Sequence, residues 1–288
     1  MYSHTPVNID DRGDISHTYV ELLPKFTISR SGSFSPYFTF SKGYKAGGYN
    51  TQMFSDVLQQ RIMSIMGLSE LYTFDKVVSY KPEWSLNYEL GAHWQPGHGL
   101  SVDAALFYID CRNQQLTVFP PGTTTGRMMT NAGRTRSMGV ELASTWKPTD
   151  DLTLRVSYGY TNATFRKYND GRNDYRGKRV PYAPSNTLFG EVNWRITPLR
   201  FMEVTPSLNV SARCVGNIYW NEANTVSQPF YCLPSVSVAF DAPHWSLRLW
   251  ADNFTATRYN TFYFVSIGNT FVQRGLPRLL GATVRVRI

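Results

Sequence analysis

Apolar and polar residues alternate along most of this chain with a period of two. Residues 203–214 give the clearest example, because one face collects Val204, Pro206, Leu208, Val210, Ala212 and Cys214. The intervening positions carry only polar or charged side chains, and residues 84–94 and 152–161 repeat the pattern. Since successive side chains of a β-strand point to opposite faces of a sheet, the alternation predicts strands with one apolar and one polar face.

The pattern predicts eleven strands. They lie at residues 18–30, 34–44, 83–94, 100–112, 131–147, 152–166, 186–196, 202–216, 231–241, 245–256 and 272–288. All reach or exceed the about 9–11 residues that a tilted strand needs to cross a bilayer, whereas strands of soluble domains are usually about 5–6 residues long. Trp84 and Trp94 stand at the two ends of one apolar face, which is typical of the aromatic girdles of membrane barrels.

The connections between these strands alternate in length. Short turns are predicted at 31–33, 95–99, 148–151, 197–201 and 242–244, and long loops at 45–82, 113–130, 167–185, 217–230 and 257–271. Bacterial up-and-down barrels have short turns in the periplasm and long loops outside the cell. We therefore expect an all-β fold, a transmembrane antiparallel up-and-down β-barrel. A large soluble β-sandwich is the alternative, because its strands also alternate.

The predicted strand number is odd, whereas single-chain bacterial barrels normally have an even number. An open sheet of eleven strands leaves two unpaired edges, which are very costly in lipid. We therefore expect about half of a barrel, with a closed barrel of twelve strands as the alternative. The isolated chain is then not expected to form a closed monomeric barrel.

Composition agrees with a β-protein that has one apolar face. Aromatic residues make up 15% of the chain and charged residues 17%, and the mean hydropathy is −0.31. No apolar run approaches the about 18 residues of a transmembrane helix. The net charge is +8, but the basic residues of the strands stand singly, as Arg155 and Arg213 do. Because a nucleic-acid surface needs a contiguous basic patch, no nucleic-acid partner is expected.

Signatures of catalysis and of metal binding are missing from the sequence. It contains no nucleophile elbow and no phosphate-binding loop, and its five histidines lack metal-ligand spacing. We therefore expect no enzyme activity, no catalytic residue, no cofactor and no metal site. The three cysteines are Cys111, Cys214 and Cys232, and a bridge between the last two is left open. The first residues do not read as a signal peptide, which for an exported protein indicates a processed chain or a fragment.

Six motifs occur in one order along the chain. They are SKGYKAGGYN at 41–50, YKPE at 80–83 with NYELG at 87–91, NAG at 131–133 with GVE at 139–141, VPYAP at 180–184, DNFT at 252–255 with Tyr259, and GLPR at 275–278 with Gly281. Together they resemble the C-terminal barrel of TonB-dependent outer-membrane receptors over nearly the whole chain. The departures are a last residue, Ile288, where the family usually has an aromatic one, and the absence of a plug domain and of a TonB box.

The resemblance implies a 22-stranded barrel of which this chain forms the last eleven strands. Residues 1–288 would then be a partial receptor barrel domain without a plug, located in the bacterial outer membrane. The implied function is a share in the energised uptake of a scarce nutrient, most often an iron–siderophore complex. The implied partners are outer-membrane lipid and lipopolysaccharide, the plug and N-terminal barrel half, the small nutrient ligand, and TonB only through the missing plug.

Aromatic and polar residues of the predicted outer loops are the candidate ligand contacts, because exposed aromatic side chains often anchor ligands. The candidates are Tyr49, Asn50, Tyr175, Tyr219, Trp220, Tyr259 and Tyr263. Tyr182, Phe262 and Phe264 are further loop aromatics. Residues 53–66 predict a short amphipathic helix in the longest loop. On the polar face, Glu141 and Arg155 are expected on adjacent strands, where they could form an ion pair.

Three other functions remain open. A complete small outer-membrane pore or adhesin of twelve strands would need no plug and would conduct passively. A truncated receptor product would have no function by itself. A soluble carbohydrate-binding β-protein is the third alternative.

Overall fold

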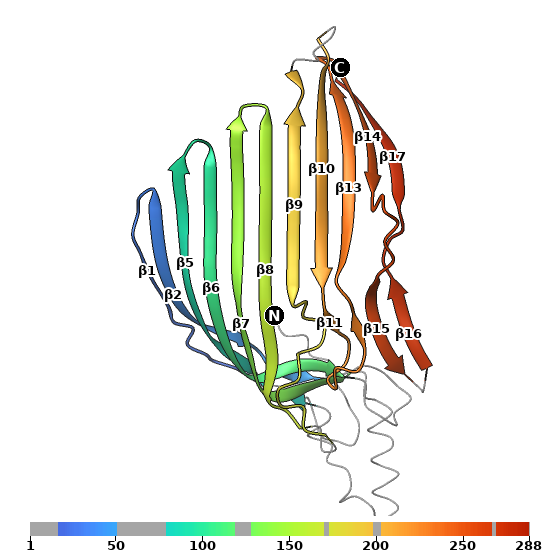
Figure 1. Cartoon of the computed structure of the whole chain (residues 1–288). Coiled ribbons are helices and arrows are strands. Elements are labelled where there is room, and N and C mark those ends of the chain that lie inside the picture. The colour runs from blue at the N-terminus through green and yellow to red at the C-terminus, as the bar shows by residue number, and fades with distance from the viewer. Residues whose placement is uncertain are drawn as a thin grey trace, which may run out of the picture.

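The structure is a computed structural model, and it describes residues 17–50, 79–118, 128–169, 173–197, 203–266 and 269–287. Its main feature is one antiparallel sheet of eleven strands (Figure 1). These strands are β1 (Lys25–Ser29), β2 (Phe34–Lys45), β5 (Glu83–Gly97), β6 (Leu100–Val118), β7 (Met128–Thr149), β8 (Leu152–Lys167), β9 (Asn186–Arg195), β10 (Thr205–Gly216), β13 (Tyr231–Asp241), β14 (Trp245–Asp252) and β17 (Leu279–Val286). Each pairs with the next of this series, which confirms the predicted up-and-down order.

Several strand boundaries were predicted wrongly, and the first strand begins at Lys25 rather than at residue 18. β6 and β7 continue to Val118 and from Met128, into the segment expected to be a loop. Their hairpin bends across one end of the sheet (Figure 1), and Asn113 takes a φ of 52° at the bend. The last strand begins at Leu279 rather than at residue 272, because 272–274 belong to a separate hairpin.

Short turns gather at one end of the sheet, at the top of Figure 1, and the longer connections at the other. The turn between β5 and β6 needs left-handed backbone at three successive residues, and two of them, Gly97 and Gly99, are glycines. We name the two ends the short-turn end and the long-loop end.

Three small strand pairs lie in the long connections. They are β3 (Gly48–Tyr49) with β4 (Ser79–Tyr80), β11 (Ile218–Tyr219) with β12 (Ser227–Gln228), and β15 (Asn260–Ser266) with β16 (Asn269–Arg274). No helix in the described segments is long and apolar enough to cross a membrane. The helix predicted at 53–66 lies outside the described residues.

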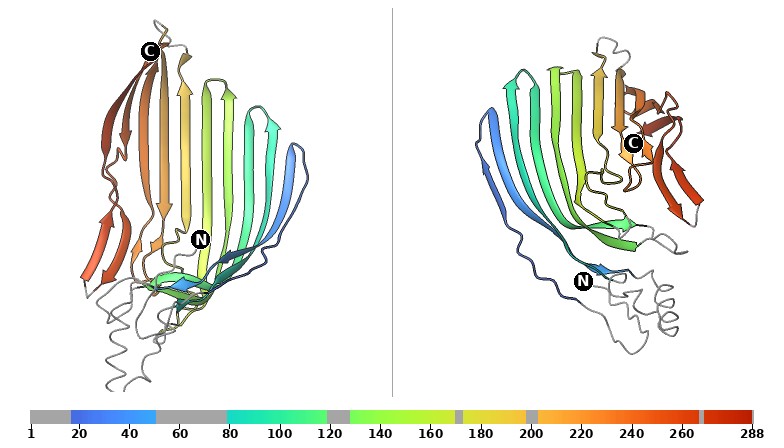
Figure 2. Two further views of the ribbon diagram at one scale, coloured as in Figure 1. Left: turned by 180° about the vertical axis from the view of Figure 1, so that it is seen from behind. Right: turned by 60° about the horizontal axis from the view of Figure 1, so that its bottom comes forward.

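The sheet is curved, and β1 and β17 stand at its two opposite edges in both views of Figure 2. No pairing joins β1 to β17 within the described residues. The polar face carries grooves lined mainly by polar side chains such as Tyr37, Asp103 and Glu141, so this face is the concave one. We call it the inner face and the apolar face the outer face.

Strand register carries the predicted alternation across the whole sheet. Leu90 lies opposite Leu106, and Leu106 lies opposite Val140, so one apolar row crosses β5, β6 and β7 on the outer face. Its members are exposed, with Leu90 at 57% and Leu106 at 54%. A sheet whose large apolar side chains are this exposed along the outer face is suited to lipid contact.

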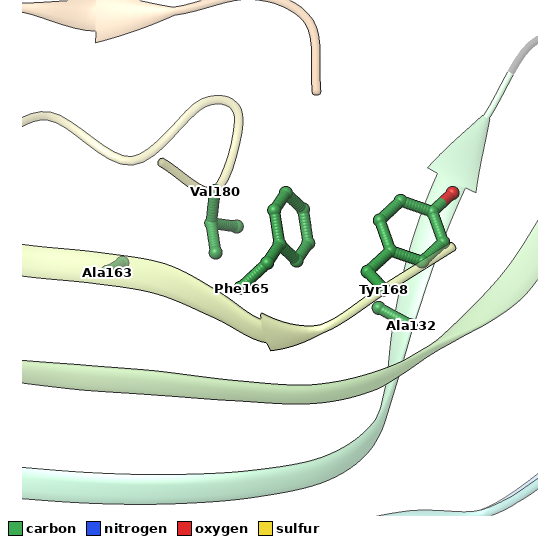
Figure 3. Packing of buried hydrophobic residues seen from close by; sticks show 5 residues of the cluster. All are labelled: Ala132, Ala163, Phe165, Tyr168 and Val180. Atoms are coloured by element: carbon green, nitrogen blue, oxygen red, sulfur yellow. The ribbon is translucent and has the colours of Figure 1, made fainter. Parts of the chain in front are cut away.

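The main buried apolar cluster lies at the long-loop end, where β7 and β8 meet the connection that follows β8. Figure 3 shows Phe165, which is fully buried, between Val180 and Tyr168, with Ala132 and Ala163 beside them. Val180 comes from the connection after β8 and is hydrogen-bonded to Ala163 through its backbone N–H. The cluster therefore joins the bent β6–β7 hairpin to the next loop.

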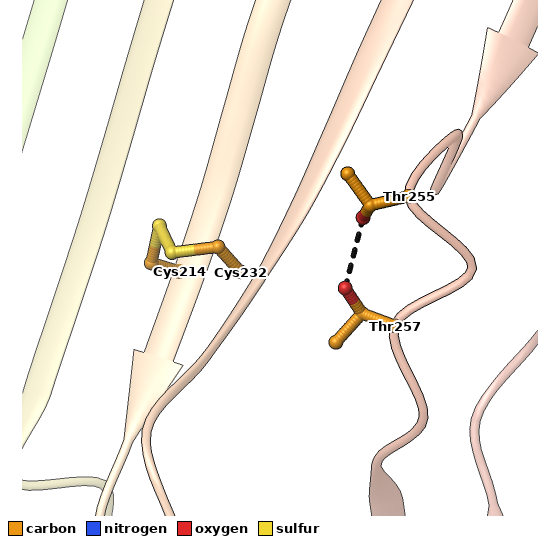
Figure 4. Close-up of a disulfide and its surroundings, with 4 residues drawn as sticks. All are labelled: Cys214, Cys232, Thr255 and Thr257. Atoms are coloured by element: carbon orange, nitrogen blue, oxygen red, sulfur yellow. Dashed lines mark hydrogen bonds between the residues drawn. A yellow bond between two sulfur atoms is a disulfide. The ribbon is translucent and has the colours of Figure 1, made fainter.

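Cys214 and Cys232 form a disulfide, which settles the question that the sequence left open. They lie directly opposite each other on β10 and β13 (Figure 4). In the same view, the hydroxyl groups of Thr255 and Thr257 are hydrogen-bonded at 2.9 Å in the connection after β14. The disulfide therefore clamps the long-loop ends of two neighbouring strands, and Cys111 stays a free, buried thiol.

Candidate functional site

Three connections meet around Tyr182 at the long-loop end. Tyr182 follows β8, Trp220 follows β11, and Phe262 belongs to β15. The ring of Tyr182 stacks on Phe262 with 5.4 Å between the centroids, and it meets Trp220 edge-on at 5.4 Å. We call these three residues the loop aromatic cluster.

The backbone of Tyr182 is held in an uncommon conformation. Its φ is +61°, in the left-handed region that a bulky side chain rarely adopts. Two hydrogen bonds fix it, because the N–H of Tyr182 donates to the Tyr219 carbonyl at 2.9 Å and its hydroxyl donates to the Tyr263 carbonyl at 2.7 Å. Strain that the surroundings hold in place in this way is typical of positions with a function.

The β15–β16 hairpin carries apolar side chains beside this cluster. The Phe262 ring contacts the Phe264 ring, which in turn stacks on Phe271 with 4.8 Å between the centroids. Phe271 is 47% exposed. The hairpin is tied to the β11–β12 pair because the buried Gln228 accepts a hydrogen bond from the Asn260 N–H at 2.9 Å.

Several candidate contacts predicted from the sequence serve the packing of the loops. The side-chain amide of Asn50 binds the backbone of Met129. Its Nδ2 donates to the Met129 carbonyl at 2.9 Å, and its Oδ1 accepts from the Met129 N–H at 2.7 Å. Trp220 is only 6% exposed. Tyr175 packs against the buried cluster of Phe165 and lies 5.3 Å from the Tyr168 ring.

The other four predicted residues are partly exposed. Tyr259 stacks on Tyr231 with 4.5 Å between the ring centroids. Tyr263 offers its carbonyl to Tyr182, and Tyr219 does so in the same way. Tyr49 lies in β3, opposite Ser79 of β4. The structure therefore brings Tyr219, Trp220 and Tyr263 together, whereas no described contact joins Tyr49 and Asn50 to that group.

A polar network crosses β2, β5 and β6 on the inner face. The hydroxyl of Tyr37 donates to Glu89 Oε1 at 2.7 Å, and His93 Nδ1 lies 2.5 Å from Asp103 Oδ1. The rings of Tyr37 and His93 stack at 5.2 Å. Tyr37, His93 and Asp103 line a groove of about 320 Å³. The sequence alone does not reveal this network, because only the register brings the four residues together.

The predicted pair of Glu141 and Arg155 is wrong. Glu141 lies opposite Gly159, and Arg155 instead contacts Glu191 on its other neighbour, with 2.6 Å between Nη1 and Oε2. Asn209 donates to the second oxygen of the same carboxylate at 2.9 Å. The adjacency of the strands was correct, but the offset between them separates the two charges.

A second inner-face groove, of about 560 Å³, lies at the short-turn end. Asp151 accepts hydrogen bonds there from the Thr197 hydroxyl and from Arg195 Nε, the latter at 2.8 Å. These two donors, Thr197 more than Arg195, hold the pKa of Asp151 below its ordinary value. This carboxylate therefore stays charged into acidic solution.

No group of three or more potential metal ligands occurs within the part of the chain that the structure describes. The inner face and the loop aromatic cluster instead offer hydrogen-bonding groups and flat apolar surfaces. Such an arrangement is suited to binding an organic molecule by stacking and polar contact.

Comparison with known proteins adds the family. Residues 2–254 match the model of the TonB dependent receptor-like β-barrel family. The pesticin receptor of Yersinia enterocolitica is 26% identical over 251 residues, which cover 87% of this chain and 33% of that protein. The ferrioxamine receptor of the same organism is 30% identical over 173 residues, or 59% of this chain and 22% of that protein. The chain thus spans about a third or less of the length of these relatives.

Solved structures give the same fold. The ferric yersiniabactin uptake receptor of Yersinia pestis matches with a TM-score of 0.71 and 21% identity, over 92% of this chain and 36% of that one. The ferric preacinetobactin receptor of Acinetobacter baumannii matches with a TM-score of 0.63 and 17% identity, over 91% and 36%. Since the family model covers most of its residues, the chain belongs to the TonB dependent receptor-like β-barrel family.

Proposed function

We propose that this chain forms part of the barrel wall, and part of the ligand-facing loops, of an outer-membrane receptor that takes up a ferric siderophore. Three observations support the proposal. The family is one of receptors, the relatives include receptors named for ferrioxamine and ferric yersiniabactin, and the outer face of the sheet is apolar and exposed.

The loop aromatic cluster carries the proposal. Tyr182 is 41% exposed although two hydrogen-bonded and two ring-packed neighbours hold it, so its ring is exposed at the surface rather than buried. A rigid aromatic ring with a polar tip gives a ligand contact area at little loss of conformational freedom. We propose that Tyr182 and Phe262 contact the organic part of the siderophore, with Tyr219 and Tyr263 beside them. Tyr49 and Tyr259 are proposed as further contacts from other parts of the long-loop end.

We propose that the remaining wall of the barrel pairs with the two edges of this sheet. β1 and β17 each have one neighbour among the described strands, and unpaired backbone groups are very costly in lipid. The inner-face network of Tyr37, Glu89, His93 and Asp103 then faces the interior. There it would contact a plug, through which TonB would drive uptake.

Ferric siderophore binding by the receptor in membranes tests the function. The probes are ferrioxamine B and ferric yersiniabactin, and the variants are Tyr182→Ala and the outer-face control Tyr108→Ala, which is similarly exposed at 39%. We expect one of the two probes to bind, and Tyr182→Ala to weaken its affinity by about 30-fold or more while Tyr108→Ala leaves it unchanged. Failure of both probes, or equal losses in the two variants, would contradict the proposal.

A further inference from the structure

The outer face changes its chemistry abruptly near the long-loop end of β5, β6, β7 and β8. One row consists of Tyr88, Tyr108, Met138 and Asn162, which lie opposite one another in turn. The next row toward the long-loop end is Leu86, Asp110, Arg136 and Thr164, and beyond it Trp84 lies opposite Arg112 and Arg112 opposite Arg134. We call Arg112, Arg134 and Arg136 the outer arginine cluster.

The cluster holds more positive charge than its own carboxylate balances. Arg134 binds Asp110 through two hydrogen bonds, of 2.6 Å from Nε and 2.9 Å from Nη2. Arg112 lies over the Trp84 ring at 4.7 Å. Three guanidinium groups thus lie near the single carboxylate of Asp110, which binds only Arg134, and Arg112 and Arg134 lie directly opposite each other. Like charges in that position are destabilising without a counter-charge.

Polar atoms beside the cluster are also unsatisfied. Arg136 Nε, Thr164 Oγ1 and Asn162 Oδ1 are all shielded from solvent and have no hydrogen-bond partner among the described residues. Arg136 and Thr164 lie opposite each other, and Asn162 is one position further along the same face. Because buried polar groups are nearly always hydrogen-bonded, this gathering of three points to a bound group that the chain itself does not supply.

The rest of the outer face has no comparable feature. Its outward positions on β9, β10, β13, β14 and β17 carry no acidic or basic side chain. In the described strands, outward charges occur only at the long-loop ends of β2, β6, β7 and β8. On β8, Lys167 lies opposite Arg134, and on β2, Lys42 already has Glu21 as its ion-pair partner. The cluster is therefore a local site and not a general property of this surface.

We propose that the outer arginine cluster binds the phosphate headgroup of a membrane lipid. Guanidinium groups match phosphate oxygens with paired hydrogen bonds, and the Thr164 hydroxyl can donate a further one. The acyl chains would lie over the adjoining row of Tyr88, Tyr108 and Met138 and then along the apolar row of Leu90, Leu106 and Val140. Basic pockets at this depth bind anionic lipid headgroups in membrane proteins. The inference rests on the proposed location in a membrane but not on any siderophore.

Native mass spectrometry of the protein in mild detergent tests the site. The probes are a diphosphorylated lipid A, the same lipid without its phosphates, and inorganic phosphate. The variant is Arg112→Gln/Arg136→Gln, and the control is Arg248→Gln/Arg285→Gln on the inner face, which has the same change of charge. We expect the first variant to lower the occupancy of the phosphorylated lipid by about 30-fold, while the control leaves it unchanged.

Three results would overturn the proposal. One is equal binding of the lipid without phosphates, since the apolar rows alone would then hold it. Another is full competition by millimolar inorganic phosphate, since the site would then take any small anion. The third is equal losses in the two double variants. Arg134→Gln/Asp110→Asn replaces the ion pair with two amide side chains. Lipid binding by this variant tests the cluster when the ion pair is absent. Siderophore binding measured on the same samples separates a failure of this site from a failure of the proposed function.

Discussion

The outer face of the sheet presents separate apolar side chains, whereas the inner face joins its polar side chains into pairs that bridge neighbouring strands. Leu90 and Leu106 are each more than half exposed on the outer face. On the inner face, Arg155 contacts Glu191 and Tyr37 contacts Glu89. The same strands supply both faces, so the difference comes from the surroundings of each face and not from the backbone.

This difference predicts how a substitution on each face changes the stability of the fold. An outer side chain has few protein neighbours, so the free-energy cost of replacing it depends on the medium around the sheet. An inner side chain contacts a specific partner on the next strand, so the free-energy cost of replacing it depends on how well the new side chain packs against that partner. Matched substitutions on the two faces can therefore separate the two effects.

A charge at the middle of the outer face should have the largest effect. Val210 points outward in the middle of β10, and Ser211 is the next residue on the inner face. We expect Val210→Arg to lower the free energy of unfolding by about 2–4 kcal/mol, because a lipid-facing arginine is costly near the bilayer midplane. Ser211→Arg should cost about 0.5 kcal/mol or less. Urea unfolding in lipid vesicles measures both, and equal losses would mean that the outer face does not contact lipid.

Substitutions at two strand glycines compare how tightly side chains pack on the two faces. A Cβ at Gly139, on the inner face, would lie 1.9 Å from the Tyr160 carbonyl and 2.6 Å from the Phe107 ring. A Cβ at Gly190, on the outer face, would meet nothing within 4 Å. We expect Gly139→Ala to cost about 1–3 kcal/mol and Gly190→Ala to gain about 0.5 kcal/mol, since alanine is less flexible when unfolded. Unfolding curves of the two variants measure both changes in stability. A shift of both curves in the same direction would contradict the difference in packing between the two faces.

The strands and their faces could be predicted from the sequence because period-two alternation is a local property. Each alternating stretch, such as 203–214, specifies its own two faces without knowledge of its neighbours. The six motifs led to the family in the same way, and the comparison confirmed it. The boundary of the last strand was wrong because 272–274 pair within a hairpin, and pairing is not a local property.

The contacts between strands and loops could not be predicted for the same reason. The register decides that Arg155 meets Glu191 instead of Glu141, and that Cys214 meets Cys232. Trp220 looked like an exposed loop residue, but Tyr182 comes from another loop to cover it. Such arrangements depend on offsets between strands and on loop packing, which leave no periodic signal in the sequence.

The inner-face ion pair should have a smaller effect than the glycines. Arg155 is about half exposed at its side chain, so solvent screens its attraction to Glu191. A double-mutant cycle with Arg155→Ala and Glu191→Ala should give a coupling energy of about 0.5 kcal/mol. High salt should reduce this coupling but leave the cost of Val210→Arg unchanged. A coupling that does not respond to salt would contradict an electrostatic origin.

The smallest effect belongs to Asp151, where the inner face meets the short-turn end. Its pKa is lowered by the Thr197 hydroxyl and by Arg195, so the folded state binds a proton at this carboxyl less readily than the unfolded state does. The stabilisation is therefore fully present above the unfolded pKa of about 3.9, and it is lost as the pH falls through the lower folded pKa. Asp151→Asn should remove this stabilisation, so the melting temperature should be slightly lower near neutral pH and should fall less steeply in that acidic window. The matched control is Asp150→Asn, because the Asp150 side chain makes no hydrogen bond or ion pair among the described residues. If the melting temperature of Asp150→Asn also falls less steeply in acid, the pH dependence comes from net charge and not from the contacts of Asp151 with Thr197 and Arg195.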